Sequence, residues 1–272
     1  MDYQMLVLDI DGTLTTSKKE ISPATKEALL AIQEEGYYVV LASGRPTGGM
    51  IRYAKELQLK KYGNYLLSFN GARIINCKTQ EIIYEKTLPQ NVIPNLYQEA
   101  LRFGVGILAY QEDYIIAGTP IDRYMELESK INALPIKEVP QFDTYVSFPS
   151  NKCLMTGEPN LLLKVEAALK EQYHTYLSIY RSEPYFLEIM PQRIDKAHSL
   201  QKLVTSLGLT MDQMICCGDG FNDVTMIEAA GLGVAMSNAQ DIVKEAADYI
   251  TDSNDNEGIV QVIQKFLKYS NN

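Results

Sequence analysis

Four positions along the chain carry polar side chains that could act together on an anionic substrate. They are the pair Asp9 and Asp11, the hydroxyl of Ser43, the ammonium of Lys196, and the pair Asp219 and Asp223. Carboxylates can bind a metal ion, attack as nucleophiles or move protons, while a hydroxyl and an ammonium can hold an anion. Two carboxylates that share one site repel each other unless a cation lies between them. A site that gathered these groups would therefore call for a metal ion.

Each of these positions lies at the start or end of an element in an alternating α/β pattern. Apolar runs end at Asp9, Ser43 and Asp219, as is typical of strands buried on both faces of a parallel sheet. Helices are predicted over residues 23–35, after a Ser-Pro start, and over 196–207. Open α/β sheets bind ligands beyond the carboxyl ends of their strands, so we expect these polar groups at one edge.

The sequence predicts an α/β fold in which a second domain interrupts the first. With 272 residues the chain exceeds the usual size of one domain. We expect a doubly wound, Rossmann-like parallel sheet formed by residues 1–84 and 189–272, and an inserted α+β domain over 85–188. The sequence pattern changes at Asn70-Gly71, a hairpin-type dipeptide. Beyond it, helices alternate with half-polar strands, as in an α+β domain.

Composition excludes several classes of partner. The net charge of −9 and the lack of a basic stripe argue against a nucleic-acid surface. No apolar run is long enough to span a membrane, and the first residues do not resemble a signal peptide, so a cytoplasmic protein is expected. The four cysteines have no metal-binding spacing and are expected to be reduced. Oligomeric state is not predicted.

The grouped residues have a definite chemistry if they meet at one sheet edge. Asp219 and Asp9, with or without Asp223, would bind Mg²⁺, which prefers oxygen ligands. An aspartate could then attack the phosphorus of a phosphate ester and form an aspartyl-phosphate, while a second aspartate serves first as general acid and then as base. Three groups would hold the remaining phosphoryl oxygens: Ser43, the Gly44 amide and Lys196.

Several segments resemble the four motifs of the haloacid dehalogenase superfamily of phosphohydrolases. They are, in chain order, Asp9-Ile10-Asp11-Gly12-Thr13, Ser43-Gly44-Arg45, Lys196, and Gly218-Asp219-Gly220-Phe221-Asn222-Asp223. Asn70-Gly71-Ala72, the large insertion, and Tyr185-Phe186-Leu187-Glu188-Ile189 are similar to the Cof-type branch with its large cap, and most closely to its bacterial sugar-phosphatases. The resemblance covers essentially the whole chain.

The resemblance implies a role for each acidic residue. Asp9 would be the nucleophile and a metal ligand. Asp11 would be the general acid and base, with its backbone carbonyl also on the metal. Asp219 would bind Mg²⁺ directly, and Asp223 would bind the metal or support it.

The resemblance also implies how the phosphate is held. Ser43 and Lys196 would bind it, and Asn222 would help to place the phosphate or Asp223. Arg45 is expected to reach the substrate edge or an acidic neighbour. Ala197 departs from the glycine that usually follows the lysine, which affects the geometry at the start of the helix.

The leading hypothesis is a Mg²⁺-dependent phosphatase that hydrolyses phosphomonoesters of small metabolites, with sugar phosphates as the expected substrates. One alternative is a phosphomutase that transfers the phosphoryl group between hydroxyls of a sugar. Another is a non-catalytic protein that binds a phosphorylated ligand on the same scaffold.

Overall fold

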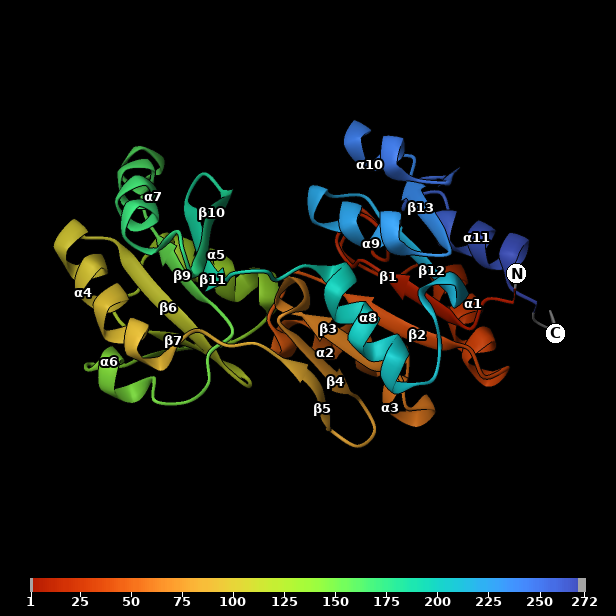
Figure 1. The fold of residues 1–272 in the computed structure, drawn as a ribbon, viewed down its shortest axis with the longest axis horizontal. Coiled ribbons are helices and arrows are strands. Elements are labelled where there is room, and N and C mark those ends of the chain that lie inside the picture. Colours follow the sequence, from red (N-terminus) through yellow and green to blue (C-terminus); the bar gives the residue numbers. More distant parts are fainter. Residues whose placement is uncertain (1, 269–272) are drawn as a thin grey trace. The chain divides into compact units, whose positions relative to one another are not determined.

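The computed structural model describes residues 2–268, which form two compact units. The core unit contains the described residues up to Arg45, Met50–Tyr84 and those from Asp195 onward. The insertion unit contains Pro46–Gly49 and Glu85–Ile194. Each unit has its own sheet (Figure 1). Each also has its own hydrophobic core.

The core unit is built on an eight-stranded sheet in the order β14-β13-β12-β1-β2-β3-β4-β5. From β14 to β3 all neighbouring strands pair in parallel, and β4 pairs antiparallel with β3. The strands are β1 Met5–Leu8, β2 Tyr38–Ala42, β3 Tyr65–Ser68, β4 Arg73–Asn76, β5 Ile82–Glu85, β12 Met214–Gly218, β13 Leu232–Met236 and β14 Tyr249–Thr251.

Strand β1 lies in the interior of this sheet, as its unbroken apolar run predicts. All four of its residues are buried, and Met5 is in register with Tyr38 of β2 on one side and Met214 of β12 on the other. The sheet therefore joins the two ends of the sequence. The carboxyl ends of β2, β1 and β12 lie side by side along one edge.

Helices flank the core sheet on both faces (Figure 1). They are α1 Pro23–Glu34, α2 Thr47–Glu56, α3 Leu59–Tyr62, α8 Lys196–Ser206, α9 Val224–Ala229, α10 Asp241–Ala246 and α11 Gly258–Phe266. Helix α1 begins as predicted, because the Ser22 hydroxyl accepts a hydrogen bond from the Thr25 amide at 3.1 Å and Pro23 occupies the first turn.

The insertion unit has a six-stranded sheet in the order β10-β11-β9-β6-β7-β8. Its strands are β6 Gly106–Gln111, β7 Tyr114–Ala117, β8 Ile136–Glu138, β9 Cys153–Thr156, β10 Leu177–Glu183 and β11 Phe186–Pro191. Its helices are α4 Ile93–Phe103, α5 Arg123–Asn132, α6 Phe142–Tyr145 and α7 Pro159–Tyr173. Apolar faces of α4 and α7 pack with the sheet to form the core of this unit.

The structure confirms the predicted fold class and most of the predicted elements. Strand β8 and the one-turn helix α6 were not expected, because a three-residue strand and a single helical turn are too short to show periodicity. Strand β11 pairs with β10 and β9, so the insertion unit continues past residue 188. The division into an inserted domain over residues 85–188 and a core domain over the remaining residues stays a prediction. In the chain between residues 2 and 268, no helix combines the length and apolar character that crossing a membrane requires.

Candidate active site

The predicted polar residues of the core unit follow neighbouring parallel strands. Asp9 comes directly after β1, Ser43 after β2 and Asp219 after β12. The Asp9 amide donates a hydrogen bond to the Cys217 carbonyl at 3.0 Å, which continues the pairing of β1 with β12 up to the site. The parallel register thus brings residues more than 200 positions apart to the same sheet edge, as predicted.

Three carboxylates form a compact acidic cluster at this edge. Asp9, Asp219 and Asp223 each offer one oxygen, and these oxygens all lie within 4.8 Å of one another. Asp9 and Asp223 are buried, and Asp219 is half-buried. Such a cluster is costly in a folded protein unless cations neutralise it.

Lys196 supplies one of those cations. It is the first residue of α8 and is only 1% exposed, and its Nζ donates to Asp9 Oδ1 at 2.6 Å and to Asp223 Oδ1 at 2.6 Å. A third hydrogen bond goes to the Ala42 carbonyl at 2.8 Å, so all three donors of the ammonium are used within the protein. The partners of Lys196 here are therefore the two carboxylates, and a phosphate would have to replace one of these bonds.

Asp223 is held by the backbone as well as by Lys196. Its Oδ2 accepts hydrogen bonds from the amides of Asp219 at 3.0 Å and Gly220 at 2.9 Å. Both of its oxygens are thus occupied, which suits Asp223 to shaping the loop after β12. Within residues 2–268, by contrast, Oδ2 of Asp9 and Oδ2 of Asp219 accept no hydrogen bond.

The electrostatics of the cluster favour binding of a further cation. Burial and the neighbouring Asp223 raise the pKa of Asp9 well above its ordinary value, although Lys196 opposes the shift. Burial also raises the pKa of Asp219 to about 6. Burial by itself would lower the pKa of Lys196, but Asp223 and Asp9 outweigh it and raise that pKa. Three ionised carboxylates against one ammonium leave a net charge of −2, which one divalent cation would cancel.

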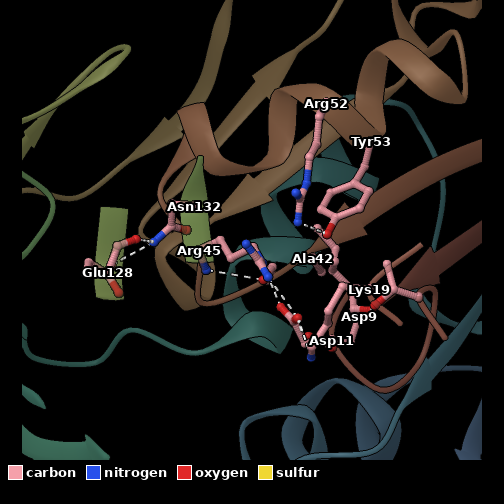
Figure 2. A network of polar contacts seen from close by, with 12 residues as sticks. Asp9, Asp11, Lys19, Ala42, Arg45, Arg52, Tyr53, Glu128 and Asn132 are labelled. Atoms are coloured by element: carbon pink, nitrogen blue, oxygen red, sulfur yellow. Dashed lines mark hydrogen bonds and ion pairs between the residues drawn. The ribbon is translucent and has the colours of Figure 1, made fainter. Parts of the chain in front are cut away.

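Asp11 lies apart from this cluster in a network with two cations (Figure 2). Arg45 contacts it through Nε at 2.6 Å and Nη2 at 2.9 Å, and Lys19 Nζ lies 3.0 Å from Oδ1. Burial would raise the pKa of Asp11, but the hydrogen bonds and charges of Arg45 and Lys19 outweigh it and lower the pKa to about 2. Asp11 is therefore ionised here, which suits a general base. To donate a proton, it would have to lose these contacts.

Replacing Arg45 tests this network. In an Arg45→Met protein the pKa of Asp11 should rise from about 2, because the two strongest contacts that favour its charged form are gone. Titration of the Asp11 carboxyl carbon by NMR measures the shift. Arg52→Met is the matched control, because Arg52 forms no ion pair with Asp11 among the described residues. An unchanged pKa in Arg45→Met would show that Arg45 does not hold the charge.

The expected phosphate-binding residues lie around a turn that follows β3. The buried Ser43 hydroxyl accepts a hydrogen bond from the Arg45 amide at 3.2 Å, and the Asn222 side-chain amide donates to Asn70 Oδ1 at 3.0 Å. A Cβ at Gly44 would lie 3.1 Å from the same Asn70 oxygen. Asn70 thus connects two predicted phosphate contacts, Gly44 and Asn222.

Sequence reasoning assigned Asn70 to a turn and to a segment that resembles the Cof-type branch, but not to the site. The residue has a positive φ of 54°, which asparagine tolerates better than most residues, and this conformation turns the chain beside Gly44. The Asn-Gly dipeptide indicated a hairpin, which the antiparallel pairing of β3 with β4 confirms. Neither the dipeptide nor the resemblance of Asn70-Gly71-Ala72 to the Cof-type branch indicated a place in the site.

The loop after β1 is fixed by contacts that the sequence also did not reveal. Gly12 has a φ of 90°, and a Cβ there would lie 2.3 Å from the Asp219 carboxylate, so only glycine fits. Thr13 Oγ1 donates to Asp219 Oδ1 at 2.7 Å. Asn238 donates to the Gly12 carbonyl at 2.8 Å. From the sequence alone Asn238, which follows Met236-Ser237, is interpreted as a helix cap; this is wrong, because the N-cap of α10 is Gln240.

The chain is similar in sequence and structure to known hydrolases. A family model described as haloacid dehalogenase-like hydrolase matches residues 6–263. The crystal structure of a haloacid dehalogenase-like hydrolase from Bacteroides thetaiotaomicron is 45% identical, with a TM-score of 0.95 over 97% of this chain and 99% of that one.

Two further similar proteins have names that state an activity. The 5-amino-6-(5-phospho-D-ribitylamino)uracil phosphatase YcsE of Bacillus subtilis is 29% identical over 98% of this chain and 97% of its own length. The structure of sugar phosphatase BT4131, of subclass IIB, is 25% identical with a TM-score of 0.78, over 97% of this chain and 98% of that one.

Proposed function

The chain belongs to the haloacid dehalogenase-like hydrolase family, and from this premise we propose that it is a Mg²⁺-dependent phosphatase of small phosphorylated metabolites, sugar phosphates in particular. At the coarser level, the family and the phosphatases that resemble the chain make it a phosphoric monoester hydrolase. The observation that carries the finer proposal is the cluster of Asp9, Asp219 and Asp223, with Lys196 between two of its members.

The donors in this cluster fit a magnesium ion. Mg²⁺ prefers hard oxygen ligands and is usually bound by one or two carboxylates while it keeps several waters. Among the described residues Oδ2 of Asp219 accepts no hydrogen bond and could bind the ion. Asp9 would bind it through the carboxylate oxygen that does not attack, and the Asp11 carbonyl is a third proposed ligand. Asp223 would support these ligands through the loop that it anchors. When bound, the ion would shield the incoming phosphate from the carboxylates and polarise it for attack.

Three residues of the chain would carry out the steps of the reaction. Oδ2 of Asp9 attacks phosphorus, the ester bond to the leaving oxygen breaks, and an aspartyl-phosphate forms on Asp9. Asp11 delivers a proton to the leaving oxygen and then removes one from the water that hydrolyses the aspartyl-phosphate. Lys196 orients Asp9 through Oδ1, which leaves Oδ2 available.

The phosphate itself would be held by groups around the strand ends. These are the Ser43 hydroxyl, the Gly44 amide, Asn222 and, after exchange of one hydrogen bond, Lys196. Donors held in place by the backbone stabilise the charge that develops on the phosphoryl oxygens without reorganising during the reaction.

Metal binding should depend on pH. A proton competes with Mg²⁺ for Asp219, whose pKa is raised to about 6, so affinity should fall by up to about tenfold per pH unit below that value and level off above it. Calorimetric titration with Mg²⁺ on both sides of pH 6 measures this. Thr13→Val removes a hydrogen bond that lowers the pKa of Asp219, so it should move the midpoint to higher pH. An affinity that does not vary with pH would contradict this assignment.

One assay separates hydrolysis from the phosphomutase alternative. With a hexose 6-phosphate and Mg²⁺, a phosphatase releases inorganic phosphate in proportion to the alcohol formed. A mutase instead interconverts isomers without net release. Release of phosphate that stops when the metal is chelated would support the proposal. Isomerisation without release of phosphate would contradict it.

A further inference from the structure

We propose that a hollow in the core unit beside Asp11 binds the hydroxyl-rich, non-phosphorylated end of the substrate and disfavours a second anionic group there. This inference rests on the proposed phosphatase function and assigns specificity to residues outside the four motifs. The hollow has a volume of about 360 Å³ and is lined by Lys19, Glu20, Ile21, Arg52, Tyr53 and Glu56. That volume is at the lower end of the range for small-molecule sites.

Lys19 connects the hollow to the reacting groups. Lys19 is one of the residues that line the hollow. Its ammonium contacts Asp11 Oδ1 at 3.0 Å (Figure 2). Asp11 is the residue proposed to protonate the leaving oxygen, so the leaving group must lie against it. The part of the substrate beyond that oxygen would reach Lys19 next and then enter the hollow.

Arg52 presents a positive charge without an acidic partner. Its guanidinium stacks over the Tyr53 ring, with Cζ 4.5 Å from the ring centroid, and it donates a hydrogen bond to the Tyr53 hydroxyl (Figure 2). Within residues 2–268 it forms no ion pair, although Glu20 and Glu56 line the same hollow. Stacking on the ring holds the guanidinium in place while most of its five N–H donors remain available.

The two glutamates supply acceptors on the same surface. The carboxylate of Glu20 has no hydrogen bond or ion pair with any described residue, and Glu56 has only a contact of 3.6 Å with Lys26. The buried residues Ile21 and Tyr53 line the same hollow. The hollow therefore combines a guanidinium with N–H donors to spare, the Glu20 carboxylate, which has no partner among the described residues, the loosely paired Glu56 and two buried side chains.

This combination selects one class of ligand. A hydroxyl group can accept from Arg52 or Lys19 and donate to Glu20 or Glu56, so a chain or ring with several hydroxyls can satisfy both kinds of group. A second phosphate can only accept hydrogen bonds, so it would be repelled by the carboxylates of Glu20 and Glu56. The hollow offers no cation besides Arg52 and Lys19 to offset this repulsion among the described residues. A neutral polyol or sugar portion is thus favoured over a bisphosphate.

Two esters of the same chain length test the inference. Hexitol 6-phosphate carries the hydroxyls, and n-hexyl phosphate lacks them. The readout is the ratio of kcat/KM for the two esters, measured with Mg²⁺ in the wild-type protein and in Arg52→Met and Glu20→Gln. Lys55→Met on the same helix and Glu27→Gln on α1 are the matched controls, because both residues are exposed and neither lines the hollow.

The expected result is a ratio that falls about tenfold in each hollow variant, mainly through KM of the hexitol ester, since one hydrogen bond to a charged group is lost. The control variants should keep the wild-type ratio. Wild-type protein should also use hexitol 1,6-bisphosphate less efficiently than the monophosphate. An unchanged ratio in both hollow variants, an equal fall in the controls, or a preference for the bisphosphate would overturn the inference. If neither monophosphate ester released phosphate, the proposed function itself would fail, and this inference with it.

Discussion

An Asp9→Asn protein is expected to lose phosphatase activity by about 10⁴-fold or more while it keeps its fold. The amide has no charged oxygen to attack phosphorus, and removal of a nucleophile in other enzymes costs this much or more. Asparagine has nearly the same shape, and its carbonyl can still accept the hydrogen bond from Lys196 at the end of β1. Phosphate release is the measurement, and thermal unfolding checks the fold.

The matched control for this substitution is Asp212→Asn, which removes an exposed carboxylate of the same unit outside the cluster. It should retain wild-type turnover. If Asp9→Asn kept even a tenth of the activity, Asp9 could not be the nucleophile, whatever the effect on metal binding.

A Lys196→Met protein is expected to be both less stable and less active. Methionine fills a similar volume, but it leaves Asp9 and Asp223 buried without the ammonium that contacts both at 2.6 Å. Breaking a buried ion pair in this way typically costs about 3–5 kcal/mol. Activity should fall by about 10²–10³-fold, because the same residue orients Asp9 and is proposed to hold the phosphate.

Magnesium distinguishes this explanation from a simple packing defect. Urea unfolding with and without Mg²⁺ should show that the ion restores part of the lost stability, since it supplies positive charge to the same carboxylates. Lys202→Met, an exposed substitution on the same helix, should change neither stability nor activity appreciably. A loss of stability in Lys196→Met that Mg²⁺ does not reduce would contradict the electrostatic account.

The placement of the site could be predicted because it depends on strand ends. Asp9, Ser43 and Asp219 each follow an apolar run, and parallel pairing of β2, β1 and β12 brings such positions together in any doubly wound sheet. A local pattern and one topological rule were therefore enough to group these residues.

The contacts of individual side chains could not be predicted in the same way. The sequence suggested an anionic partner for Lys196, but not that two carboxylates and the Ala42 carbonyl would occupy all three of its donors. For Arg45 an acidic neighbour was one of two expectations, and the structure shows that it is Asp11, contacted through two nitrogens. Such contacts join residues far apart in sequence, and they depend on side-chain directions that hydrophobic periodicity does not encode.

The extent of the insertion unit was difficult for a different reason. Strand β11 carries an apolar pattern that would suit either sheet, and all of its residues are buried. Only its pairing with β9 and β10 assigns it to the insertion unit, and pairing is a long-range property.

The most direct test of the account is to trap the aspartyl-phosphate. In an Asp11→Asn protein, p-nitrophenyl phosphate should still phosphorylate Asp9, because nitrophenolate leaves with little need for a proton, but hydrolysis should stall without the base. Rapid quenching and mass spectrometry should then find one phosphoryl group on the peptide that contains Asp9, with a burst of one nitrophenol per active site. Continued turnover with no burst and no phosphoryl group on Asp9 would contradict the mechanism.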